Sequence, residues 1–173
     1  MILTGPEIIQ QVRAGRIEIV PFDLGQVNPN SYNFRLGRTI KYYANHILDP
    51  KIKQDVITED IGEDGFILFP GRIYLGHTLE IMGSDHYVPI IKGRSSTARL
   101  GLFIHITADI IDIGSHNQWT LQLYAVQPVR VYYRMLIGQV TFWHIYGDIM
   151  LYNGKYQGSM GPYESRIYED FNK

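Results

Sequence analysis

Short runs of β-branched and aromatic residues, separated by turn-forming residues, recur along most of this 173-residue chain. Residues 103–107, 119–125, 129–132 and 137–143 are such runs, and Gly, Pro, Asn or Asp residues lie between them. Many short strands with this punctuation favour an all-β sandwich or a jelly-roll-like barrel. The sequence therefore predicts a mainly β fold with a few short helices.

A Pro-Gly dipeptide lies between two other predicted strands. Residues 66–71 and 74–80 are rich in apolar residues, and Pro70-Gly71 is a favourable turn sequence. These features predict two strands joined by a Pro-Gly turn. Residues 38–63 show a mixed pattern from which no strand is predicted.

Two segments have helical character. Thr4 and Glu7 have the spacing of a capping box, in which both side chains bond to backbone N–H groups, and Gly15 can end the helix that follows. Residues 96–100 are the second candidate, with one or two helical turns.

Composition limits the classes of function. The formal net charge is −1, there is no cysteine, and no window is apolar enough for a membrane span. Disulfide scaffolds and thiolate zinc sites are therefore excluded, and a general nucleic-acid or membrane-surface binder is disfavoured. We expect one soluble, cytoplasmic domain that binds neither nucleic acid nor membranes.

Residues 93–102 (GRSSTARLGL) concentrate groups that suit an anion. Arg94 and Arg99 offer fork-shaped donors for phosphate oxygens, and Ser95 and Ser96 add hydroxyl groups. A phosphorylated small molecule is the expected ligand. The alternative is a surface turn with two solvated arginines.

Asp112 follows in a strand-like apolar run, residues 110–114. A carboxylate there costs free energy unless it has partners. It is either the cap of a turn at Gly114 or a functional group that orients water or accepts a hydrogen bond from a sugar hydroxyl.

The tail from Gly147 onward is rich in glycine, with aromatic residues and Lys155. Such tails are usually disordered, but glycine hinges, aromatic rings and a lysine also suit a lid over a nucleotide.

Several common chemistries are absent from the sequence. It contains no phosphate loop, no dinucleotide-binding glycine motif and no zinc-deaminase signature, and its six histidines lack metal-ligand spacing. The expected metal is Mg²⁺ that arrives with a polyphosphate and is bound by phosphate oxygens and water.

Residues 93–102, followed by 105–108 and Asp112, resemble the dCTP deaminases, which share a superfamily with the trimeric dUTPases. The resemblance extends over nearly the whole chain, through residues 1–3, 28–32, 35–37, 120–121, 137–139, 155–158 and 165–166. It implies a distorted jelly-roll or β-barrel of the dUTPase type. Residues 1–173 would form a single domain, with residues from about 147 to 173 as a lid. It also implies a homotrimer with sites shared between subunits.

The resemblance assigns a role to each matching position. It implies that the nucleotide is bound by Arg94, Ser95, Ser96, Thr97, Ala98, Arg99, Asp112, Thr120, Leu121, Gln122, Gln139, Tyr152 and Lys155. Asp112 would contact the deoxyribose 3′-hydroxyl, and the backbone of Thr120 and Leu121 would contact the pyrimidine edge. The implied catalytic group consists of Ser95, Arg99, Asp112 and the residue at position 122.

Gln122 departs from the family, in which a glutamate at this position is the general base of deamination. An amide cannot take a proton from water, and general acid–base catalysis typically contributes about 10²–10⁴-fold. Residues 115–118 and Ser159 are milder departures. Within residues 115–118 the family usually has an aromatic residue and a glycine, and at position 159 it often has a glutamine.

The resemblance implies a hydrolase of pyrimidine deoxynucleotide metabolism, but the residues leave three functions open. The first is a dCTP deaminase-family enzyme that acts on dCTP or dUTP and supplies dUTP or dUMP for thymidylate synthesis, with dTTP as a possible inhibitor. The second is a dUTP diphosphatase that uses Asp112 and Mg²⁺. The third is a catalytically silent trimer that binds deoxynucleoside triphosphates.

Overall fold

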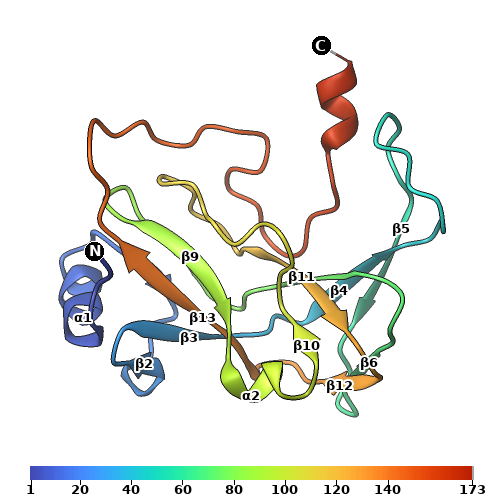
Figure 1. The fold of residues 1–173 in the computed structure, drawn as a ribbon, viewed down its shortest axis with the longest axis horizontal. Helices are drawn as coiled ribbons and strands as arrows, with labels where there is room; N and C mark the ends of the chain where they lie inside the picture. The colour runs from blue at the N-terminus through green and yellow to red at the C-terminus, as the bar shows by residue number, and fades with distance from the viewer. Residues whose placement is uncertain (173) are drawn as a thin grey trace.

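Two antiparallel sheets form the centre of the fold in the computed structural model, which describes residues 1–172 (Figure 1). The first sheet contains, in spatial order, β2 (Val27–Asn28), β3 (Ser31–Arg35), β13 (Leu136–Trp143) and β9 (Val88–Gly93). The second contains β10 (Leu102–Phe103), β11 (Thr120–Ala125), β7 (Tyr74–His77), β4 (Thr39–Tyr43) and β5 (Val56–Asp60). The predicted mainly β fold is confirmed.

Shorter elements join these sheets. Two strand pairs are formed by β1 (Glu18–Val20) with β8 (Ile81–Gly83) and by β6 (Phe66–Leu68) with β12 (Val129–Val131). The helices are α1 (Gly5–Arg13), α2 (Ser95–Ala98) and two 3₁₀ segments, η1 (Leu24–Gln26) and η2 (Ile167–Phe171). No helix within residues 1–172 is long and apolar enough to cross a membrane.

The packing of the core brings β3 and β13 into close approach. Tyr32 and Phe34 of β3 are fully buried, and the register places Phe34 opposite Gly138 of β13. A Cβ atom at Gly138 would lie 2.3 Å from Phe34 Cζ and 2.4 Å from Ile104 Cδ1. Glycine is therefore required at this close approach.

The two strands predicted on either side of the Pro70-Gly71 turn are confirmed as β6 and β7, but they do not pair with each other. A turn with Gly71 at φ +88° does follow β6, but β6 pairs with β12, whereas β7 pairs with β4 and β11. The turn sequence fixes a local change of direction, while the partner of each strand is decided by burial in the assembled sheets.

Three other local expectations need correction. Residues 38–63 contain the antiparallel pair β4–β5, which the mixed pattern concealed because most of β5 is exposed. Thr4 is the N-cap of α1, but its side chain makes no capping hydrogen bond, so the capping box is wrong. The expected strand at 103–107 is limited to β10, which ends at Phe103. Gly15, at φ +70°, follows the helix as expected.

The C-terminal tail leaves the end of β13 and returns across the molecule to η2, near β5 (Figure 1). It has little regular structure before η2, but its backbone bonds to the domain at several points. This course places the tail above β11.

Candidate functional site

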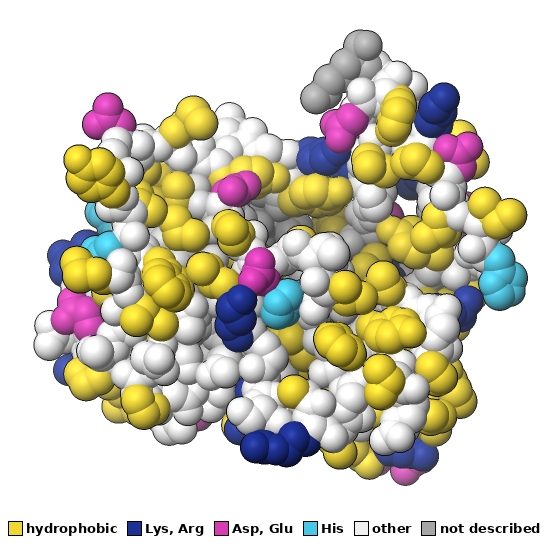
Figure 2. Space-filling model, viewed as in Figure 1, with side chains coloured by type: hydrophobic (Ala, Val, Ile, Leu, Met, Phe, Trp, Pro, Cys, Tyr) yellow, Lys and Arg dark blue, Asp and Glu magenta, His cyan; other side chains and the backbone are white. Residues whose placement is uncertain are grey.

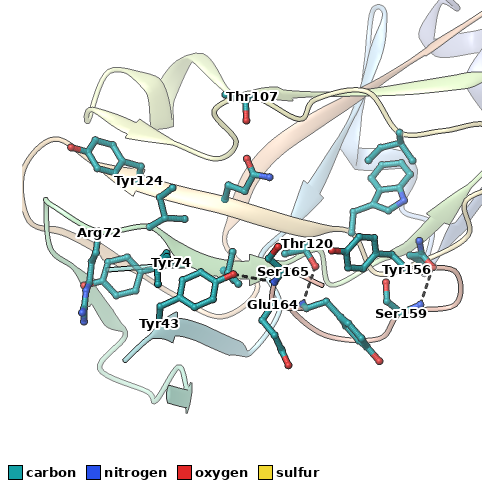
Figure 3. A pocket seen from close by; sticks show the side chains of 18 of the residues that line it. Tyr43, Arg72, Tyr74, Thr107, Thr120, Tyr124, Tyr156, Ser159, Glu164 and Ser165 are labelled. Atoms are coloured by element: carbon teal, nitrogen blue, oxygen red, sulfur yellow. Dashed lines mark hydrogen bonds between the residues drawn. The ribbon is translucent and has the colours of Figure 1, made fainter. Parts of the chain in front are cut away.

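A cavity of about 1060 Å³ lies on the face of the second sheet that carries Thr120, Gln122 and Tyr124 (Figure 3). Alternation along β11 creates this face, since Leu121, Leu123 and Ala125 are fully buried in the core. Residues of β7, the loop before β11, and the tail complete the walls. The alternation of side chains thus gives β11 one face that packs in the core and one face that lines the cavity.

Gln122 occupies the centre of this arrangement. The register pairs Gln122 with Leu75 of β7, and Leu75 in turn pairs with Lys41 of β4. Residues directly opposite in antiparallel strands project to the same face, so Lys41 and Gln122 share the cavity face two strands apart. Gln122 and Leu75 both line the cavity.

Of the two predicted backbone contacts, Thr120 and Leu121, only Thr120 lies at the cavity. On the side away from β7, β10 pairs with β11 only at Tyr124 and Ala125. The Thr120–Leu121 end of β11 therefore has no strand partner on that side among residues 1–172. Thr120 lines the cavity, whereas Leu121 is fully buried, backbone included, and does not line it.

Asp112 lines the cavity at the start of a turn, and of the predicted strand-like run only Ile110 pairs, in an isolated antiparallel bridge with Ile90 of β9. The turn is closed by a hydrogen bond from Ser115 N to Asp112 O, and Gly114 adopts φ +87°. The Asp112 side chain is exposed, and its carboxylate accepts no hydrogen bond from the described residues. Water solvates this carboxylate, so it needs no partner in the protein to offset a free-energy cost of burial. It is therefore free to accept a hydrogen bond from a ligand.

The tail is attached along residues 114–118, at one wall of the cavity. Ser159 N donates to Asn117 Oδ1 at 2.9 Å, Gly161 N donates to Gln118 Oε1 at 2.8 Å, and Gln157 Nε2 donates to Gly114 O at 2.7 Å. Tyr152, one of the predicted contacts, lines the cavity.

The last part of the tail crosses the cavity face itself. Tyr163 N donates to Thr120 Oγ1 at 3.0 Å, and Ser165 N donates to the Tyr43 hydroxyl at 3.0 Å, as Figure 3 shows. Between them, Glu164 pairs with Lys41 at 2.7 Å. Burial would raise the pKa of Glu164, but the hydrogen bond from Lys41, a backbone hydrogen bond and the charges of Lys41 and Lys53 together outweigh it, and the pKa is lowered.

The predicted phosphate-binding motif lies away from this cavity. Arg94 donates from Nη1 to Leu136 O at 3.1 Å, and Thr97 is buried and donates to Arg94 O at 2.8 Å. The exposed positions of the motif are Ser95, Ser96, Ala98, Arg99 and Leu100. None of residues 94–99 lines the cavity, so one chain does not bring the two groups of predicted residues together.

Gln139 and Lys155 also lie outside the cavity lining. Gln139 belongs with the motif, because its Nε2 donates to Gly93 O at 3.2 Å and its Oε1 accepts from Ser31 Oγ at 2.7 Å. Lys155 Nζ contacts Asp170 Oδ2 at 3.0 Å, and this hydrogen bond raises the pKa of Lys155.

Sequence reasoning missed most of the cavity walls. Tyr43, Tyr74 and Tyr124 lie at one end, and Tyr156 lies at the other beside Ser159, which the sequence marked only as a departure from the family (Figure 3). The two-residue spacing from Thr120 through Gln122 pointed to Tyr124, but the others come from distant strands and from the tail. Among the described lining residues, Arg72 is the only Arg or Lys. The cavity thus suits a planar ring better than three phosphates.

Comparison with known proteins connects this geometry to a family. A family model described as dCTP deaminase-like matches residues 2–145. A protein of Clostridium beijerinckii named "dCTP deaminase, dUMP-forming" is 46% identical over 174 residues and covers 100% of both chains. A protein of the same name from Leptospira biflexa is 42% identical and covers 100% of this chain and 99% of its own.

The fold has a solved counterpart as well. A crystal structure of 2′-deoxycytidine 5′-triphosphate deaminase from Agrobacterium tumefaciens superposes with a TM-score of 0.63 and 21% identity, covering 82% of this chain and 47% of that chain. This likeness supports the fold alone.

The relatives correct one expectation from the sequence. The sequence left a dCTP deaminase and a separate dUTP diphosphatase as alternatives. The second alternative is wrong, because full-length relatives are named as dCTP deaminases that form dUMP. Their name joins deamination to a monophosphate product in one protein. The separate diphosphatase is therefore discarded.

Proposed function

Because the chain belongs to the dCTP deaminase-like family, we propose that it converts dCTP to dUMP in pyrimidine deoxynucleotide metabolism. The observation that supports this proposal best is the cavity face, where Asp112, Thr120 and Gln122 meet beneath the tail. A deoxynucleoside fits these groups: a carboxylate for the sugar hydroxyl, strand backbone for the pyrimidine edge, and an amide beside the base.

The reaction has two hydrolytic steps. In the first, a water oxygen bonds to C4 of cytosine and the 4-amino group leaves as ammonia, giving dUTP. In the second, water attacks phosphorus and diphosphate leaves, giving dUMP. The Gln122 amide can orient the water of the first step and contact the base, but it cannot accept the proton, so we expect this step to be slow.

We further propose that the site is completed by a neighbouring chain in a homotrimer. The cavity lacks the positive charge that a triphosphate needs, whereas Arg94 and Arg99 lie outside it. Figure 2 shows exposed hydrophobic side chains at many places on one face of the molecule. Hydrophobic side chains are exposed in and beside the motif, with Leu100 at 52%, Phe103 at 51% and Val126 at 57%. Covering this patch with another chain would bury apolar surface and bring the arginines to the neighbour's cavity.

Mg²⁺ is expected to enter with the triphosphate. Among residues 1–172 no group of three His, Asp or Glu side chains is placed to bind a metal, and a cation carried by phosphate oxygens needs no such group. It would neutralise phosphate charge.

The test is incubation with dCTP and Mg²⁺, with separation of dCTP, dUTP and dUMP by chromatography and measurement of ammonia. We expect dUMP, diphosphate and ammonia in equal amounts. Binding of dCTP without any ammonia release would contradict the proposal and favour the silent binding protein.

A further inference from the structure

His116 lies between two carboxylates that come from distant parts of the chain. Its Nδ1 is 2.6 Å from Glu18 Oε2 of β1, and its Nε2 is 3.0 Å from Asp85 Oδ1 in the turn after β8. All three side chains are partly exposed, at 33% for His116, 40% for Glu18 and 51% for Asp85. We call these three residues the His116 clip.

The geometry defines the protonation state of the ring. A neutral imidazole has one N–H and one lone pair, so it can donate to only one of two flanking carboxylates. The second carboxylate would then face a lone pair. Only the imidazolium donates at both nitrogens, and both bonds are then charge-assisted.

The charges around the ring agree with this geometry. Partial burial works to lower the pKa of His116, but the hydrogen bonds to Glu18 and Asp85 outweigh it and raise the pKa. Glu18 and Asp85 are the charged groups that act on His116 from β1 and from the turn after β8. Gly83 permits the close approach, because a Cβ atom there would lie 2.6 Å from Nδ1.

The clip connects directly to the candidate site. The neighbours of His116, Ser115 and Asn117, are buried and line the cavity. Asn117 exchanges backbone hydrogen bonds with Met82 of β8, and Gly114 N donates to Ser84 O. The same turn carries Asp112, and Asn117 Oδ1 binds the tail at Ser159. The turn from Asp112 to Asn117 thus carries part of the cavity wall and one attachment point of the tail.

We propose that His116 is a positioning residue, whose imidazolium fixes the Asp112–Asn117 turn against β1 and β8 and thereby strengthens nucleotide binding at the candidate site. The inference rests on the proposed function, since it names what orients that site. Its consequence is pH dependence. Because the folded-state pKa is raised above about 6.5, the stabilisation is complete below that value and is lost as pH rises through the folded pKa.

The test measures the dissociation constant of a dUTP analogue with an NH bridge between the α- and β-phosphorus atoms, from pH 6 to pH 9, with Mg²⁺. The titration of His116 is followed by NMR, and we expect wild-type affinity to fall about fivefold as the imidazolium loses its proton. This factor is at the lower end of the typical coupling between separate sites. In His116→Gln the affinity should be weaker at low pH and should lack this step. Glu18→Gln, which keeps the histidine, should move both the NMR titration and the step to lower pH.

His86→Gln is the matched control, because His86 is an exposed histidine beside Asp85. It should keep the wild-type profile, including any contribution from titration of the phosphate itself. The same pH profile in His116→Gln and wild type, or a His116 titration midpoint at or below about 6.5, would overturn the inference.

If the analogue does not bind at any pH, the proposed function fails, and the clip is tested without nucleotide. Hydrogen-exchange protection of the Gly114 and Asn117 amides should then decrease above the His116 titration in wild type but show no such step in His116→Gln. Protection that does not follow the titration in wild type would overturn the clip itself.

Discussion

Replacing Gln122 by glutamate should restore the proton acceptor that deamination requires. The side chains have nearly the same shape, and the register opposite Leu75 keeps position 122 on the cavity face. Gln122 is only half-buried, so the new carboxylate stays partly hydrated and remains ionised as a base. Lys41, two strands away on the same face, is already paired with Glu164 and does not neutralise it directly.

The expected gain is the typical contribution of a general base. A rise of about 10²–10⁴-fold in the rate of ammonia release corresponds to about 3–5 kcal/mol of barrier, at about 1.4 kcal/mol for each factor of ten. The change should appear in kcat, because the base acts in the transition state and the substrate contacts are retained. Loss of diphosphate from dUTP should change much less.

The assay is single-turnover conversion of dCTP with excess protein, followed by chromatography of dCTP, dUTP and dUMP. Gln127→Glu is the matched control, because Gln127 is exposed and outside the cavity lining, and it should leave the rate unchanged. Equal ammonia release by wild type and Gln122→Glu would show that position 122 is not the site of proton transfer.

Three further predictions concern the tail, the assembly and the buried ion pair. Removal of the tail after Gly147 should weaken nucleotide binding by tenfold or more, about 1.4 kcal/mol, because the bonds from Ser159, Gly161 and Tyr163 are lost. Calorimetry measures this affinity, and an unchanged value would contradict the role of the tail as a lid. Light scattering should give three times the 20.0 kDa chain mass, and a monomer that binds nucleotide fully would contradict a shared site. Arg35→Met should lower the free energy of unfolding in urea by about 3–5 kcal/mol, because Glu80 is fully buried and bonds to Arg35 Nε at 2.7 Å. Lys92→Met, at the more exposed pair with Asp109, should have little effect, and equal losses would refute this reasoning.

The sequence predicted the elements better than their partners. Strand β11 was recognisable because Leu121, Leu123 and Ala125 alternate with polar and aromatic residues. The partner of β7 was not, because pairing across tens of residues depends on the burial of whole sheets, and Pro70-Gly71 carries only local information.

The site was predicted in two parts for a similar reason. Family resemblance identified Asp112, Thr120 and Gln122, which the structure places on one cavity, and the 93–102 motif, which it places elsewhere. Tyr43 belongs to the same cavity but carries no local signal, because a tyrosine in a strand has the same pattern whether it binds a ligand or not.

The separation of the arginine motif from the cavity has a genetic consequence if sites form between chains as proposed. A chain altered at Arg99 would keep an intact cavity, and a chain altered at Asp112 would keep an intact arginine motif. Co-expression of the two inactive chains would then restore activity at the interfaces where the two intact halves meet. An extra copy altered in both halves would instead lower the activity of wild-type chains by entering their trimers.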